Sequence, residues 1–231
     1  IATDADCDGV LASDDCDDND ENSTTLATDA DCDGAYDLEI VSAGGEHSCG
    51  IDSSGSIQCW GFDAYGQSTP PSGSFVQISS GESHSCAIDT EGVAHCWGHN
   101  DTGQSTPPDV SFVQISAGIS HSCGVDTNNV VHCWGYDGHG EASGMPDETF
   151  TAVSAGTYHS CGITTDQELR CWGNNSNGEL NHPSGTFLHV SAGTFFSCAI
   201  DTNYEVQCWG VAIMHDLGQT TPPEGLVVWS E

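Results

Sequence analysis

The sequence predicts an all-β repeat protein, and two regularities carry this prediction. A fifteen-residue stretch recurs with starts 37, 37, 38 and 37 residues apart, a period typical of solenoids and propellers. Each copy contains two cysteines ten residues apart. The copies are His47–Gly61, His84–Gly98, His121–Gly135, His159–Gly173 and Phe196–Gly210.

Each copy folds naturally as a β-hairpin. Turning the first copy at Ser54 places Cys49 opposite Cys59 and Ile51 opposite Ile57, and the same register fits every copy. Opposed residues in an antiparallel pair are ~4.5–5.5 Å apart at Cα, which suits a disulfide. Five pairs of buried free thiols are the alternative. The expected pairs are Cys49–Cys59, Cys86–Cys96, Cys123–Cys133, Cys161–Cys171 and Cys198–Cys208.

A short apolar strand that ends in small residues precedes every hairpin, for example 38–44 and 75–81. Each repeat therefore offers three strands. After the Cys-Trp-Gly triplet comes a polar stretch that ends in Gly-Gln-Ser-Thr-Pro-Pro at 66–71 and 103–108. Proline has no N–H for a strand ladder, so these stretches are expected to be blade-to-blade connections or edge strands.

These motifs over residues 38–230 resemble the regulator-of-chromosome-condensation repeat family, particularly its extracellular bacterial branch with His-Ser/Thr-Cys-Ala and Cys-Trp-Gly-x-Asn. The resemblance implies a β-propeller of about five to six short three-stranded blades over residues 36–231. A further inner strand is expected at 226–230, with no hairpin after it. Five blades could close with this strand as a clasp, or the ring could borrow a strand from elsewhere, because an open sheet edge recruits another chain.

Residues 1–35 form a separate segment, rich in Asp and too poor in apolar residues to bury a core. Thr-Asp-Ala-Asp-Cys-Asp-Gly occurs at 3–9 and again at 28–34. Alternate carboxylates before a glycine bend match the first positions of a calcium loop. The segment resembles thrombospondin type-three repeats, which implies an irregular arm wrapped around Ca²⁺. The expected ligands are Asp4, Asp6, Asp8, Val10 (through its carbonyl), Asp15, Asp17, Asp20, Asp29, Asp31, Asp33 and Asp37.

Three cysteines lie in this calcium arm, which is an odd number. We favour a Cys16–Cys32 pair, which leaves Cys7 for an upstream repeat or another chain. A Cys7–Cys16 pair would leave Cys32 instead.

The composition excludes some partners. The chain has one arginine, no lysine and 35 acidic residues, with a formal net charge of −34. Nucleic acid is therefore an unsuitable partner, because phosphate binding needs Lys and Arg. No apolar run approaches the ~20 residues of a membrane-spanning helix. Regular disulfides predict an oxidising, extracellular or cell-surface location.

Two sets of recurring residues invite functional interpretations. The histidine that opens the first four copies could form a ring of metal ligands, but Phe196 replaces it in the fifth. A structural histidine bonded to a neighbouring loop is favoured. The tryptophan in every Cys-Trp-Gly could line a sugar site, but packing between blades is the simpler interpretation.

No nucleophile elbow, phosphate-binding glycine loop or zinc-protease helix occurs in the sequence, so a non-enzymatic protein is expected. The first hypothesis is a calcium-stabilised structural or adhesive extracellular protein that self-associates, as a filament subunit, through its N-terminal arm and propeller. The alternative is a soluble module that binds a protein or a glycan, like an inhibitor or a lectin, on one propeller face.

Overall fold

The structure is a computed structural model that describes residues 38–210 and 218–223. Fifteen strands and no helix are found in these ranges. They are β1 (Leu38–Ala43), β2 (His47–Asp52), β3 (Ile57–Gly61), β4 (Phe75–Ser80), β5 (His84–Asp89), β6 (Ala94–Gly98), β7 (Phe112–Ala117), β8 (His121–Asp126), β9 (Val131–Gly135), β10 (Phe150–Ala155), β11 (His159–Thr164), β12 (Leu169–Gly173), β13 (Phe187–Ala192), β14 (Phe196–Asp201) and β15 (Val206–Gly210).

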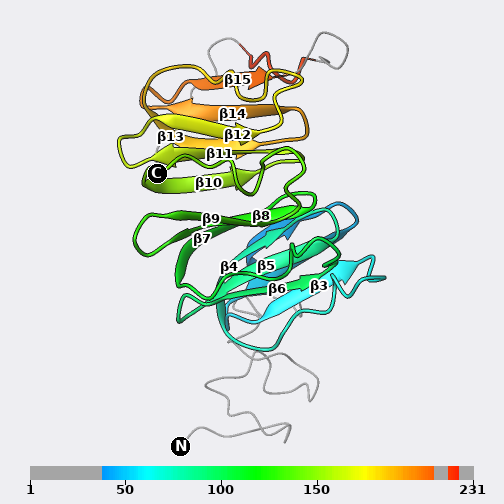
Figure 1. Cartoon of the computed structure of the whole chain (residues 1–231). Coiled ribbons are helices and arrows are strands. Elements are labelled where there is room, and N and C mark those ends of the chain that lie inside the picture. Colours follow the sequence, from blue (N-terminus) through cyan, green and yellow to red (C-terminus); the bar gives the residue numbers. More distant parts are fainter. Residues whose placement is uncertain (1–37, 211–217, 224–231) are drawn as a thin grey trace, which may run out of the picture.

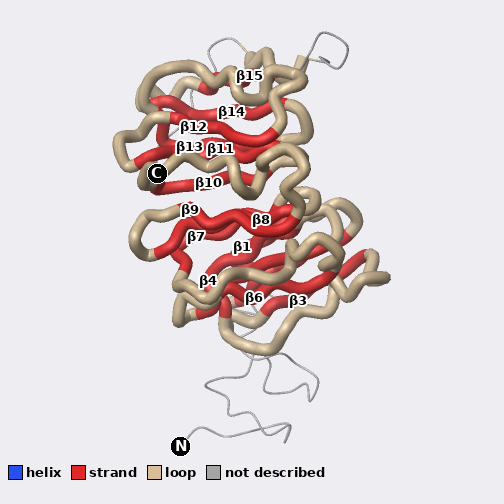
Figure 2. Tube along the Cα trace, in the orientation of Figure 1, coloured by secondary structure: helices blue, strands red, loops and turns tan. Residues whose placement is uncertain are grey.

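The strands form five separate antiparallel sheets, each made of three consecutive strands, and we call these sheets blades 1 to 5. They follow one another in chain order (Figure 1), and loops join them at both ends of the strands (Figure 2). The predicted propeller-like architecture of short three-stranded blades is therefore confirmed. The Gly-Gln-Ser-Thr-Pro-Pro stretches contain no strand and connect one blade to the next.

The predicted hairpin register is confirmed in every blade. In blade 1, Cys49 lies opposite Cys59 and Ile51 opposite Ile57. The other four hairpins repeat this pairing. All five cysteine pairs form disulfides, with Cα atoms 4.0–4.1 Å apart.

An aspartate or threonine closes each hairpin turn. Asp52 accepts hydrogen bonds through Oδ1 from the N–H groups of Ser54 and Ser56. Asp89, Asp126 and Asp201 accept equivalent bonds in their own turns. A side-chain oxygen that satisfies two backbone donors replaces the missing ladder bonds of the turn.

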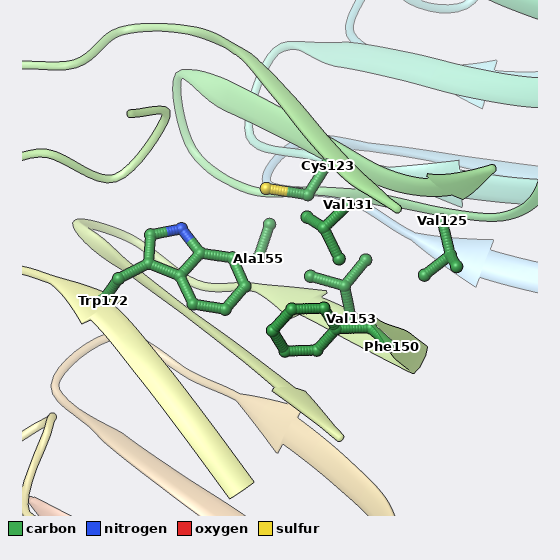
Figure 3. Close-up of a cluster of buried hydrophobic side chains, with 7 residues drawn as sticks. All are labelled: Cys123, Val125, Val131, Phe150, Val153, Ala155 and Trp172. Carbon is green, nitrogen blue, oxygen red and sulfur yellow. The ribbon is translucent and has the colours of Figure 1, made fainter. Parts of the chain in front are cut away.

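The hydrophobic core lies between blades rather than inside them. Figure 3 shows one such cluster, in which Cys123, Val125 and Val131 of blade 3 face Phe150 and other side chains of blade 4. Equivalent clusters join blades 1 and 2, 2 and 3, and 4 and 5. One face of a blade thus presents the disulfide and its aliphatic neighbours. The opposite face presents Phe, Ile or Val, and Trp.

A glycine at the end of each first strand allows neighbouring blades to approach. The N–H of Glu82 donates to the carbonyl oxygen of Gly118 in the next blade, and the same bond joins Thr157 to Gly193. A Cβ on Gly81 would collide with the Gly118 carbonyl oxygen. Only glycine fits at this junction, because backbone atoms occupy the space that a side chain would need.

The predicted calcium arm and the predicted strand at 226–230 lie outside the described residues. Within the described ranges, no helix is long and apolar enough to span a membrane.

Candidate functional site

The predicted metal ligands fall outside the described residues, as does the Cys16–Cys32 pair, so both stay predictions. In the part of the chain that the structure describes, no group of three or more His, Cys, Asp or Glu side chains could hold a metal ion.

The recurring histidines join blades instead of converging on a common centre. His84 Nε2 lies 2.8 Å from the hydroxyl oxygen of Ser122 in the next blade. His47, His121 and His159 make the same contact with the serines at the equivalent position, at 2.7–2.8 Å. The predicted structural role is confirmed, but the partner is a strand serine of the neighbouring blade rather than a loop.

These imidazoles are held neutral by burial. Burial, together with the neighbouring His121, His47 and His99, lowers the pKa of His84 from 6.5 to about 3. Burial also lowers the pKa of His121 to about 4. Among the described residues, the Nδ1 atom of each interblade histidine has no hydrogen-bond partner. A proton on Nδ1 would therefore be buried without an acceptor.

In blades 2 to 5 the tryptophans pack at the same junctions, as predicted. Trp134 donates from Nε1 to the carbonyl oxygen of Gln104 at 2.9 Å, and Trp172 donates to that of Glu141 at 3.0 Å. The side chain of each acceptor residue is also buried, where it accepts an N–H of its own loop: Thr102 to Gln104 at 3.0 Å, and His139 to Glu141 at 2.7 Å.

Sequence reasoning missed the residues that pair with the recurring motifs. The second residue of the second strand in blades 2 to 5 is a buried serine that contacts the histidine of the preceding blade. The Gln or Glu at 67, 104, 141 and 179 is also buried, and its carbonyl oxygen accepts the tryptophan N–H of the following blade. Both recur at fixed positions in the repeats. This recurrence could have identified them as structural positions.

We call the full set of these contacts the blade-to-blade interface. It includes a further bond in which the serine of one first strand accepts the N–H of the next first strand, as Ser79 accepts from Ala117 at 2.9 Å. The bond recurs at every junction between described blades, at 2.8–3.0 Å.

Among the described residues, one face of blade 1 has no other blade packed against it. Val41 is 67% exposed, whereas Ile78, Ile115 and Val153 at the equivalent position are buried. Trp60 is 48% exposed, whereas its equivalents pack at the junction with the preceding blade. In blades 2 to 5, the equivalent face packs against the preceding blade.

Within the same described ranges, the opposite face of blade 5 also has no blade packed against it. It carries a largely apolar pocket of about 250 Å³, lined by His189, Val190, Ser191, Cys198, Ala199, Ile200 and Val206. In blades 1 to 4 the residues equivalent to Cys198 and Ile200 are fully covered. Phe196 lies where the other blades have the interblade histidine.

The loops after the first strands of all five blades converge on one shallow depression of about 250 Å³. Its lining comes from the same Ser-Ala-Gly ends in each repeat, such as Ala117, Gly118 and Ala155. We call this end of the molecule the loop face. The hairpin turns lie at the opposite end of the strands.

The comparisons with known proteins identify the repeats. The family model described as Regulator of chromosome condensation (RCC1) repeat matches residues 40–67, 75–104, 112–141 and 150–179, which are about half of the chain. No curated protein matches the sequence significantly.

Solved structures share the fold. The ectodomain of the Physcomitrella patens receptor kinase CR4 is 27% identical, with a TM-score of 0.63 over 75% of this chain and 50% of that one. The ectodomain of the Arabidopsis thaliana receptor kinase ACR4 is 29% identical, with a TM-score of 0.60 over 75% and 63%. Yeast RCC1 (Prp20), bound to Kap60, is 16% identical, with a TM-score of 0.65 over 80% and 57%. The chain thus spans between half and two thirds of the length of these structures.

Proposed function

Because this chain belongs to the regulator of chromosome condensation (RCC1) repeat family, we propose that it is a secreted or cell-surface, non-enzymatic structural or adhesive protein that is stabilised by calcium and assembles end to end with copies of itself. Binding to other protein chains has precedent in the fold, since yeast Prp20 was studied for binding to Gsp1p and histones.

Two observations support an extracellular location. The five disulfides need an oxidising compartment to form and persist. The two plant relatives, at 27% and 29% identity, are ectodomains of receptor kinases.

The observation that supports self-assembly is that each of the two end faces resembles one half of an internal junction between blades. Blade 5 presents the disulfide side, with Ile200 and Val206 open to a pocket. Blade 1 presents the aromatic side, with Val41 and Trp60 exposed. Four junctions inside the chain already join these two kinds of face.

The polar groups of the two ends match as well. Ser191 occupies the position of Ser154, whose hydroxyl accepts an N–H of the next blade, and Ala43 occupies the position of that donor. Thr194 occupies the position of Thr157, whose N–H donates to the carbonyl oxygen of the next blade. Gly44 of a second copy provides the equivalent carbonyl.

One difference separates the contact between copies from the contacts within the chain. Phe196 cannot form the bond that each interblade histidine makes with serine. The hydroxyl of Ser48 in a second copy would then lack that partner, at a cost of ~1 kcal/mol relative to an internal junction. The contact between copies is consequently weaker than the contacts that hold the blades together.

Joining different faces of identical chains is a heterologous contact, which grows into a filament unless the rotation closes a ring. The calcium arm precedes blade 1 in the chain. With Asp4, Asp6 and Asp8 around Ca²⁺, the arm itself would become stiffer.

Sedimentation velocity over a range of protein concentrations tests the assembly. We expect wild-type protein to form larger species with increasing concentration, and electron microscopy to show filaments that shorten when a chelator removes Ca²⁺. Val41→Asp places a charge on the contact and should abolish these species. Val113→Asp is the control, because Val113 is 57% exposed but lies on an internal blade. A wild-type protein that stays monomeric at all concentrations contradicts the proposal.

A second candidate is a soluble module that binds a protein or a glycan through the loop face. The depression on which five repeats converge favours it. In this case, deletion of residues 1–35 should leave the affinity for the partner unchanged.

A further inference from the structure

The loop face carries two groups of exposed aromatic rings that the blade-to-blade interface does not use. The first consists of Phe62, Tyr65 and His99, with Tyr65 and His99 in an edge contact 4.6 Å between ring centres. The second consists of Tyr136, His139 and Tyr158, where the rings of His139 and Tyr158 are 5.4 Å apart.

Both groups bridge neighbouring blades on the same end of the molecule. The N–H of Phe62 donates to the carbonyl oxygen of Glu46, just before β2, and Tyr136 donates to Ser120 in the same way, just before β8. The rings therefore lie at the same end of the strands as the central depression, although none of them lines it. Tyr65 is 53% exposed and Tyr158 is 39% exposed.

The His99 ring of the first group is held in place before any partner binds. His99 Nδ1 accepts a hydrogen bond from the buried Gln104 amide at 2.7 Å, so its Nε2–H points to the Asp101 carboxylate at 3.2 Å. Gln104 is fixed in turn by bonds from Thr102. His99 then loses little conformational entropy when a partner contacts this group.

The charged side chains near these rings are carboxylates. Asp101 is 88% exposed on its side chain. Glu82 extends over Gly45 at the rim of the depression. The chain's single arginine, Arg170, is bound to Glu148 at 2.9 Å and to Glu168 at 2.8 Å, so it does not neutralise this face.

We propose that the loop face binds a Lys- or Arg-rich segment of a partner protein, whose cationic side chains stack on Tyr65 and Tyr158 and pair with carboxylates such as Asp101. Aromatic faces attract cations through the ring quadrupole, and an anionic surface without lysine or arginine raises the local concentration of such a segment. This interaction is independent of assembly through the end faces.

The test uses the full chain and a fluorescein-labelled peptide with four arginines separated by Gly-Ser spacers. Fluorescence anisotropy is measured at about 50 mM and about 500 mM NaCl, since screening weakens the contact at high salt. A peptide with citrulline in place of arginine has the same shape without the charge. We expect only the arginine peptide to bind.

Matched variants at the two ends of the strands test where the peptide binds. Tyr65→Leu and Tyr158→Leu should each weaken binding about two- to five-fold, the range expected for one exposed cation–π contact. Asp101→Asn should also weaken it. Tyr204→Leu and Asp166→Asn make the same changes in the hairpin turns at the opposite end and should leave the affinity unchanged.

Three results would overturn the proposal. The first is absence of binding at about 50 mM NaCl. The second is an equal loss in the hairpin-end variants, which would mean that net charge alone attracts the peptide. The third is Tyr65-dependent binding of a neutral oligosaccharide without binding of the arginine peptide, which would assign the surface to a glycan. Unchanged thermal unfolding of the variants verifies that each is folded.

Discussion

Replacing His84 with glutamine tests how the blades are joined. His84 is fully buried, and its Nε2 lies 2.8 Å from the Ser122 hydroxyl. Ser122 donates its own hydrogen to the Gln104 carbonyl oxygen at 3.1 Å, so it accepts from His84 Nε2–H. This assignment leaves the lone pair of Nδ1 without a donor. Glutamine can keep the hydrogen bond to Ser122 but cannot bind a proton.

The sign and size of the pH effect follow from the pKa of His84, which burial and nearby histidines lower from 6.5 to about 3. The unfolded chain binds this proton near pH 6.5, whereas the folded chain does not until about pH 3. The contribution to stability is complete above pH 6.5 and is lost as the pH falls towards 3. Each buried histidine then lowers the free energy of unfolding by up to ~1.4 kcal/mol per pH unit.

Urea unfolding followed by tryptophan fluorescence at pH 7, 6, 5 and 4.5, with the disulfides intact, measures this slope. We expect the stability of wild-type protein to fall with pH more steeply than that of His84→Gln. The difference between the two proteins should change by up to about 2–3 kcal/mol between pH 7 and pH 4.5. His139→Gln is the control, because it makes the same replacement at an exposed histidine outside the blade-to-blade interface.

The titration of Asp126 does not fall in this range. Burial raises the pKa of Asp126, but hydrogen bonds from the Val130 N–H and His132 outweigh it and hold the pKa below 3.8. Its contribution is present above pH 3.8 and is lost only in stronger acid. Parallel slopes for the wild type and His84→Gln would refute the idea that a neutral, buried imidazole joins the blades.

Three further predictions concern stability and metal binding. Gly118→Ala should prevent or severely weaken folding because its Cβ would meet the carbonyl oxygen of the next blade; Gly193→Ala at the last blade, where no such carbonyl is near, should cost much less in thermal unfolding. Replacing both Cys123 and Cys133 with serine should lower the free energy of unfolding by about 2–3 kcal/mol, the expected effect of cross-linking a short loop; urea unfolding with no loss would contradict a bracing role. Calcium titration calorimetry should detect binding that vanishes when residues 1–35 are deleted, and heat that is unchanged in the truncated protein would argue against the calcium arm.

The repeat structure could be predicted because hairpin register depends on local pairing. Cys49 and Cys59 are ten residues apart, and a turn between them leaves only one register that also pairs Ile51 with Ile57. The interblade position of the tryptophans also followed from their recurrence once per repeat. Only the period and the strand alternation were needed.

The contacts between blades could not be predicted because they depend on three-dimensional placement. Nothing local to His84 indicates that its partner is Ser122, 38 residues away. The aromatic groups on the loop face were missed for a different reason. Tyr65 and Tyr158 occupy different positions in their repeats and meet other rings only when neighbouring loops are brought together.

The central claim is that the two uncovered ends are halves of one interface. Val41→Asp blocks the blade 1 end and leaves blade 5 intact, whereas Ile200→Asp blocks the blade 5 end and leaves blade 1 intact. Each variant alone should sediment as a monomer, and an equimolar mixture should form dimers and nothing larger. A mixture that stays monomeric while the wild type assembles, or single variants that still form long assemblies, would contradict the claim.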